Sequence, residues 1–185
     1  MKNDYRKKLT RQMFRSAFVS LLKEKPVQSI TVRELCEKAE VNRGTFYSHY
    51  QDMYALLDSV ENEMFSELEK TLAQFTRTHE ISFYEALLEF VKNNSDMCIV
   101  LIGKNSDRTF VDKLLSYGKE FFMRVNAGVI SQENARYAEI FYEYASYGCL
   151  RLLQLWIDGG MKESVENTAR LLEKLTAFDP NGGEL

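Results

Sequence analysis

Residues 31–50, TVRELCEKAEVNRGTFYSHY, decide the fold of this chain. They open with Thr31-Val32-Arg33-Glu34, which has the S/T-x-x-E form of a capping box and predicts a short helix over residues 31–39. After a connector of two residues, Asn42 is suited to cap another short helix that runs to about residue 49. Two short helices joined by a tight turn have the outline of a helix-turn-helix.

The flanking segments predict two longer helices around this pair. Pro26 ends the first, over about residues 4–25, and Asp52 caps the other, over about residues 53–75. Side chains expected to be buried form an apolar stripe on the first helix and anchor the two short ones: Leu9, Met13, Ala17, Phe18, Leu21, Leu22, Val32, Leu35, Cys36, Phe46 and Tyr50. The opposite face of the first helix is basic, with Lys7, Lys8, Arg11 and Arg15.

Charge is divided unequally along the chain. Residues 1–50 hold eleven Lys or Arg against five Asp or Glu, a net charge of +6, whereas the remainder holds 13 against 22, a net charge of −9. A basic module joined to an acidic body indicates that the first part meets a polyanion and the second does not.

The pattern V-x-x-G-T-F-Y-x-H-Y within residues 31–50, followed by a long apolar helix, resembles the DNA-binding signature of TetR/AcrR-type transcriptional regulators. The resemblance implies base contacts in the major groove and phosphate contacts around them. The base contacts fall on Arg43, Gly44, Thr45 and Ser48, and the phosphate contacts on Thr31, Asn42, Tyr47 and His49. Such proteins commonly carry Lys at the position of Met53, so one phosphate contact is missing and a weaker affinity or salt dependence is expected.

Composition agrees with an all-α fold. The chain has 185 residues, 45% of them hydrophobic and 28% charged, with only 2 Pro and 9 Gly. We expect a helix-turn-helix DNA-binding domain over residues 1–51, joined by a long fourth helix to a helical regulatory and dimerisation domain over residues 52–185. Further helices are expected to start at a capping box at Ser82 and to cover about residues 108–124, 132–158 and 162–177.

The predicted helix over residues 132–158 is apolar on two faces and therefore needs two partners. One is the chain's own core, and the other is expected to be a second copy, packed against Ala145, Gly148, Leu152 and Trp156. A twofold dimer sets two recognition helices about 34 Å apart, which predicts a roughly palindromic double-stranded DNA operator. The stretch Trp156–Met161 also resembles a W-x-x-G-G/N-M ending found in a subgroup of these regulators.

In this family the body commonly binds an effector that changes the separation of the DNA heads. Aromatic side chains are the candidates for lining a pocket for a small apolar or aromatic effector: Phe90, Tyr117, Phe121, Phe141 and Tyr144. The alternative is that these aromatics at helical spacing form ordinary core.

Catalysis, a metal and a cofactor are not predicted. The two histidines lie far apart, and no metal-ligand pattern accompanies His79-Glu80. The sequence also has no glycine-rich phosphate-binding loop. The three cysteines follow no disulfide or zinc spacing and no apolar run is long enough to span a bilayer, so a cytoplasmic protein is expected. Repression is the family's usual mechanism. The alternatives are activation, or a coactivator that works through a protein partner rather than operator reading.

Overall fold

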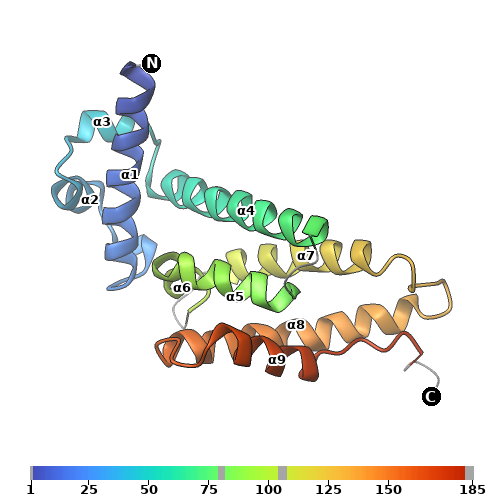
Figure 1. The fold of residues 1–185 in the computed structure, drawn as a ribbon. Helices are drawn as coiled ribbons and strands as arrows, with labels where there is room; N and C mark the ends of the chain where they lie inside the picture. The colour runs from blue at the N-terminus through green and yellow to red at the C-terminus, as the bar shows by residue number, and fades with distance from the viewer. Residues whose placement is uncertain (1, 79–81, 104–107, 182–185) are drawn as a thin grey trace. The chain divides into compact units, whose positions relative to one another are not determined.

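The computed structural model describes residues 2–78, 82–103 and 108–181, and every regular element in these ranges is helical (Figure 1). The chain forms two compact units, residues 1–70 and 71–185. In order, the elements are α1 (Lys2–Leu22), the 3₁₀ turn η1 (Val27–Ser29), α2 (Val32–Ala39), α3 (Arg43–Tyr47), α4 (Met53–Thr78), α5 (Phe83–Asn93), α6 (Ser95–Leu101), α7 (Arg108–Val125), α8 (Ala135–Asp158) and α9 (Val165–Leu175). None of the described helices is long and apolar enough to cross a membrane.

Aromatic side chains form the core of the first unit. Phe14 and Phe18 of α1 and Phe46 of α3 are fully buried. The Phe14 ring meets Phe46 edge to face, with 5.5 Å between centroids, and lies 6.1 Å from the ring of Tyr50. Such contacts hold the short α3 against α1, which a five-residue helix needs because it is not stable alone.

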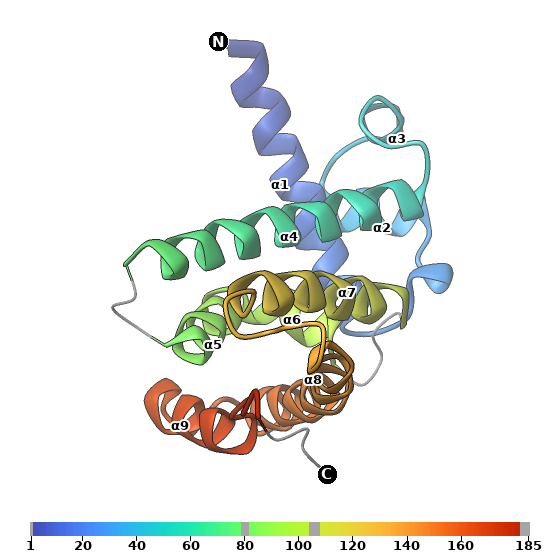
Figure 2. The ribbon, with the colours of Figure 1, turned by 90° about the vertical axis from the view of Figure 1, so that its right-hand side faces the viewer.

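The apolar stripe predicted for the first helix is correct in its second half and wrong in its first. Ala17, Phe18 and Leu21 are buried, but Leu9 is 47% and Met13 37% exposed. The reason is that the first turns of α1 extend away from the other helices of the first unit (Figure 2). Only the part of α1 from Phe14 onward therefore packs against the core of that unit. The helix also ends at Leu22, three residues before the expected end, in a hydrogen-bonded turn that leads to Pro26.

The Thr31 side of the predicted capping box is formed. The Thr31 hydroxyl accepts the backbone N–H of Glu34 at 3.2 Å, as expected. The Glu34 carboxylate also accepts a charged hydrogen bond from Lys25 Nζ at 2.7 Å, which ties the turn after α1 to α2. Hydrogen bonds from Lys25 and from the Thr31 backbone lower the pKa of Glu34. The second predicted box, at Ser82, is complete because Ser82 and Glu85 cap each other's backbone N–H groups.

The helix-turn-helix connector turns through a left-handed residue. Glu40 has φ 55°, and the N–H of Val41 closes the turn on the Cys36 carbonyl at 3.0 Å. Asn42 then caps α3, and Asp52 accepts the N–H of Ala55 to cap α4. Helix α3 ends at Tyr47, two residues earlier than predicted, because the N–H of His49 bonds to Phe46 in a tighter turn.

In the second unit α5 packs on α9, whereas α6 and α7 pack on α8. Fully buried side chains on these elements include Leu88, Cys98, Phe110 and Leu172. None of the three cysteines is in a disulfide, and Cys36 and Cys98 are buried as small apolar groups.

The Trp156–Met161 stretch is a helix stop. Gly160 adopts φ 78°, and the N–H groups of Met161 and Gly160 bond back to the carbonyls of Trp156 and Ile157. This is a Schellman ending, in which glycine takes the left-handed position at least cost. The Trp156 indole N–H donates to the Glu163 carbonyl at 3.0 Å, so its ring closes the turn from inside.

Candidate nucleic-acid interface

Helix α3 is positioned by its buried face and exposes the opposite one. Phe46 is fully buried, whereas Arg43, Gly44, Tyr47 and Ser48 are exposed and the predicted base-contact residue Thr45 is half-buried. The fold therefore presents on α3 and its C-cap a guanidinium, three hydroxyls and an open stretch of backbone. These are the groups that read base edges in a major groove.

The capping residues of α2 and α3 keep donors available for phosphate. The Asn42 side-chain oxygen accepts from the Thr45 N–H at 2.8 Å and from its hydroxyl at 3.0 Å, which leaves the Asn42 amide as a donor. Thr31 likewise uses its hydroxyl as an acceptor, and its proton remains for donation. Phosphate oxygens only accept hydrogen bonds, so both exposed caps match what DNA requires.

Gly44 and Ser48 differ in how the surrounding structure constrains them. A Cβ built at Gly44 would meet only the Asn42 side-chain oxygen, at 3.4 Å, an ordinary contact. The fold alone does not require glycine there. Ser48 Oγ donates to the Thr45 carbonyl at 2.7 Å, so in the free protein its lone pairs face outward as acceptors.

His49 connects α3 to the basic face of α1. Its ring lies 6.3 Å from the Phe14 ring, and partial burial followed by the charges of Arg11 and Lys7 lowers its pKa. Lys7 and Arg11 therefore extend the basic surface around His49. The sequence showed them only as part of a basic helix face, because spacing alone does not say which of its cations lie beside the recognition helix. A third cation of that face, Arg15, forms an ion pair with Glu63 at 3.2 Å.

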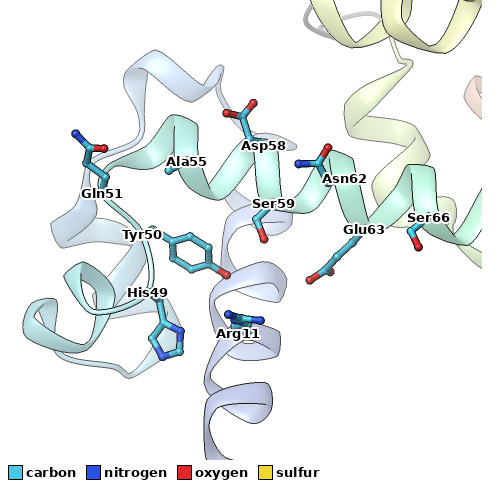
Figure 3. A pocket seen from close by; sticks show the side chains of 10 residues that line it. All are labelled: Arg11, His49, Tyr50, Gln51, Ala55, Asp58, Ser59, Asn62, Glu63 and Ser66. Carbon is cyan, nitrogen blue, oxygen red and sulfur yellow. The ribbon is translucent and has the colours of Figure 1, made fainter. Parts of the chain in front are cut away.

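A polar groove of about 650 Å³ runs between α1 and α4 beside His49 (Figure 3). Arg11 and His49 line one part of it, and Asp58 and Glu63 of α4 line another. Because carboxylates repel phosphate, the surface suited to DNA ends where α4 begins to supply them. Met53, in the first turn of α4, is only 7% exposed and cannot replace the Lys of the family.

The residues predicted for the dimer contact have different environments. Ala145 and Trp156 are 8% and 5% exposed and pack inside their own chain, so neither is available to a second copy. Gly148 is exposed with open space where a Cβ would be, and Leu152 is half-buried. A neighbouring row on α8 and a pair on α9 were not predicted and are exposed: Ile140, Tyr144, Tyr147, Leu155, Leu171 and Leu175.

The five residues predicted for the effector pocket have different environments. Phe90 is buried, and Phe121 stacks on Phe83 with 5.4 Å between ring centroids. Phe141 belongs to a different aromatic cluster, with Phe122 at 6.0 Å. Tyr144 is 79% exposed, because it lies on the outer face of α8. Tyr117 is half-buried on α7.

Comparison with known families gives two matches, one in each part of the chain. The profile of bacterial regulatory proteins of the tetR family matches residues 16–60, and that of a transcriptional regulator C-terminal region matches residues 78–177, more than half of the chain. The chain belongs to the TetR family. It is thus a DNA-binding transcriptional regulator, of a family that is not enzymatic and whose members are typically dimers.

One curated relative and several solved structures resemble this TetR-family regulator. An uncharacterized HTH-type transcriptional regulator of Bacillus subtilis (strain 168), YxbF, is 38% identical over 58 residues, which are 31% of this chain and only 15% of that protein. A TetR transcriptional regulator from Streptococcus agalactiae 2603V superposes with a TM-score of 0.69 over 95% of this chain and 98% of its own, at 24% identity. A TetR-like regulator from Rhodococcus sp. RHA1 gives 0.70 over 90% and 93%, at 18% identity. These structures support the all-helical fold.

His79 and Glu80, whose sequence was considered above for metal binding, lie outside the described residues. Within them, no group of three or more His, Cys, Asp or Glu side chains is placed to hold a metal ion.

Proposed function

We propose that this TetR-family regulator reads a palindromic operator as a homodimer through α3. The observation that carries the proposal is the division of α3 between a fully buried Phe46 and an exposed set of polar groups led by Arg43. A coactivator that no longer read DNA would have no need to present this set. The domain division proposed from the sequence, a DNA-binding domain over residues 1–51 and a regulatory domain over residues 52–185, goes with this function.

The residue roles follow from donor and acceptor chemistry. Arg43 pairs with a guanine edge, Thr45 and Ser48 contact neighbouring bases, and Gly44 lets the backbone approach. Thr31, Asn42, Tyr47 and His49 donate to phosphates on either side. Lys7 and Arg11, near His49, attract DNA phosphates whatever the base sequence of the DNA.

The dimer forms through the outer faces of α8 and α9. Helix α8 carries a row of large apolar side chains, each at least half exposed in the single chain and spaced three to eight residues apart: Ile140, Tyr144, Tyr147 and Leu155. On α9, Leu171 and Leu175 are exposed to a similar extent. A row of large apolar side chains on the surface is typical of an interface. Gly148 and Leu152 remain part of it, whereas Ala145 and Trp156 do not. A twofold axis through this face pairs the same residues of both copies.

Repression by occupying a promoter, with release by a small apolar or aromatic effector, is the mode of action proposed. The opposite direction is represented among proteins of this fold, because a dihydroxyacetone kinase operon activator, DhaS, superposes with a TM-score of 0.59 at 18% identity. A regulatory effect on transcription in either direction requires the same operator reading.

The experiment is selection of bound sequences from a random duplex library with the purified protein at near-physiological salt. The proposal predicts a palindrome whose half-sites lie about one helical turn apart. Recovery of no motif, with only weak salt-sensitive binding, would contradict operator reading and favour the coactivator function. A parallel selection with Arg43→Ala identifies the base pair that Arg43 reads.

A further inference from the structure

The segment that follows α9 places an aromatic side chain between α7 and α8. Phe178 lies 5.0 Å from Phe141, 5.3 Å from Phe122 and 5.9 Å from Tyr137, measured between ring centroids. Phe122 belongs to α7, and the other two belong to the first two turns of α8. The chain's own C-terminal segment thus supplies the fourth ring of this cluster.

The three surrounding rings form a slot with the shape of one aromatic ring. Tyr137 stacks on Phe178 at 21°, Phe122 meets it edge to face at 79°, and Phe141 is tilted at 51°. Stacked and edge-to-face arrangements at these separations are those that aromatic pairs prefer. All four side chains are half-buried, so the slot reaches the surface.

The segment can leave the slot without disturbing a helix. Before it, Thr176 is held by hydrogen bonds to the Tyr84 hydroxyl and to the Leu172 carbonyl, and these cap the end of α9. After it, the Asn134 amide donates to the Pro180 carbonyl at 3.1 Å, while the Asn181 N–H bonds within the segment to Asp179. Within the described residues, release therefore costs the docked Phe178 ring and this bond to Asn134.

Asn134 supplies a polar group beside the slot. Its amide nitrogen donates to the Val129 carbonyl at 3.0 Å as well as to Pro180, and its oxygen accepts the Ser131 N–H at 2.7 Å. Departure of the segment frees one N–H while the other bonds keep Asn134 in place. A ligand that fills the slot gains by carrying an acceptor for that N–H.

We propose that Phe122, Tyr137 and Phe141 form a binding site for a small molecule with one aromatic ring and a hydrogen-bond acceptor, and that Phe178 competes for this site. Its identification with the effector site rests on the regulatory function proposed above; the binding competition does not. The apparent affinity of the intact protein is lowered by the fraction of molecules in which Phe178 occupies the slot.

The test measures binding of acetophenone, a ring with a carbonyl acceptor, by titration calorimetry on the full chain and on Phe178→Ala. We expect Phe178→Ala to bind at least about tenfold more tightly, because its competitor is gone. Cyclohexyl methyl ketone, which has the acceptor but no aromatic faces, should bind at least about tenfold more weakly than acetophenone. Equal affinity of the two proteins for acetophenone, or of Phe178→Ala for the two ketones, would overturn the proposal.

Two further measurements separate competition from a new cavity. With 4-fluorophenylalanine in place of Phe178, saturating acetophenone should shift the fluorine signal of the intact protein to that of an exposed ring; an unmoved signal would overturn the proposal. A chain that ends at Ala177 should bind acetophenone as Phe178→Ala does, and Phe83→Ala, which opens a different aromatic pair, should not improve on wild type. No DNA is present, so failure here is distinguishable from failure of operator reading.

Discussion

At the scale of single residues, Arg43 is the side chain on which specificity depends most. We expect Arg43→Ala to lose about 1–3 kcal/mol of specific binding and to relax one position in each half-site, because a bidentate contact with guanine is removed. Competition binding with single-base operator variants measures both effects. Arg33→Ala is the matched control, since Arg33 lies exposed on the neighbouring α2 and pairs with Glu37. Equal losses for the two variants would show that Arg43 contributes only charge.

His49 should make operator binding depend on pH. Burial, Arg11 and Lys7 lower its pKa in the free protein below the ordinary value of 6.5, so the ring is neutral at pH 7.5. A phosphate favours the charged ring and raises this pKa in the complex, so binding takes up a proton. Affinity should therefore increase as pH falls from 7.5, by up to about tenfold per unit, and level off below the pKa of the free protein.

The measurement is operator affinity at several pH values and constant salt, for wild type and for His49→Gln. The variant should have a nearly flat profile over this window. A slope that survives His49→Gln unchanged would place the proton uptake on another group.

The sequence was informative about these residues because their pattern is local. Capping by Thr31 and Asn42 and burial of Phe46 and Tyr50 all follow from spacing within twenty residues, and the structure confirms them. The placement of Lys7 and Arg11 beside His49 depends on how α1 crosses α3, which no local pattern encodes.

At the scale of elements, α1 divides into a packed part and a part that stands clear of the head. Phe14→Ala should lower the free energy of unfolding by about 3–5 kcal/mol, because it leaves a cavity beside Phe46, His49 and Tyr50. Leu9→Ala should change it by no more than about 0.5 kcal/mol, because the side chain is half exposed. Urea unfolding followed by circular dichroism measures both, and a large loss for Leu9→Ala would contradict this division.

Helix positions could be predicted from sequence, but helix ends and faces only in part. Ends set by a cap, such as Asn42 and Ser82, were predicted correctly. Those set by competing contacts were not. Helix α1 ends at Leu22 rather than at residue 25, and its apolar stripe is buried only from Phe14 onward, whereas Leu9 and Met13 stay exposed.

At the scale of the whole molecule, the outer face of α8 should hold the dimer together. Leu155→Glu should shift the protein to monomers at about 10 μM, because a twofold interface receives the same charge from both copies. Val125→Glu, at an equally exposed residue near the end of α7, should leave the dimer intact. Sedimentation velocity distinguishes the species. A dimer that persists in Leu155→Glu with unchanged affinity would move the interface away from this row.

Trp156 shows why the sequence and the structure lead to different proposals for the interface. Its apolar spacing on the helix predicts burial but does not say against which chain, and in the structure it closes the turn at Gly160 within its own chain. Side chains such as Tyr144 lie exposed on the other face, and only the fold reveals that exposure.

Operator spacing tests most directly the central claim that two α3 helices read one face of a duplex as a dimer. With the selected palindrome as probe, affinity is measured after inserting five or ten base pairs between its half-sites. The account predicts a loss of at least about tenfold for five base pairs, which turn the half-sites to opposite faces of the duplex, and a smaller loss for ten, which restore the face. Equal affinity at every spacing would contradict it, because heads that bind independently do not sense the distance between half-sites.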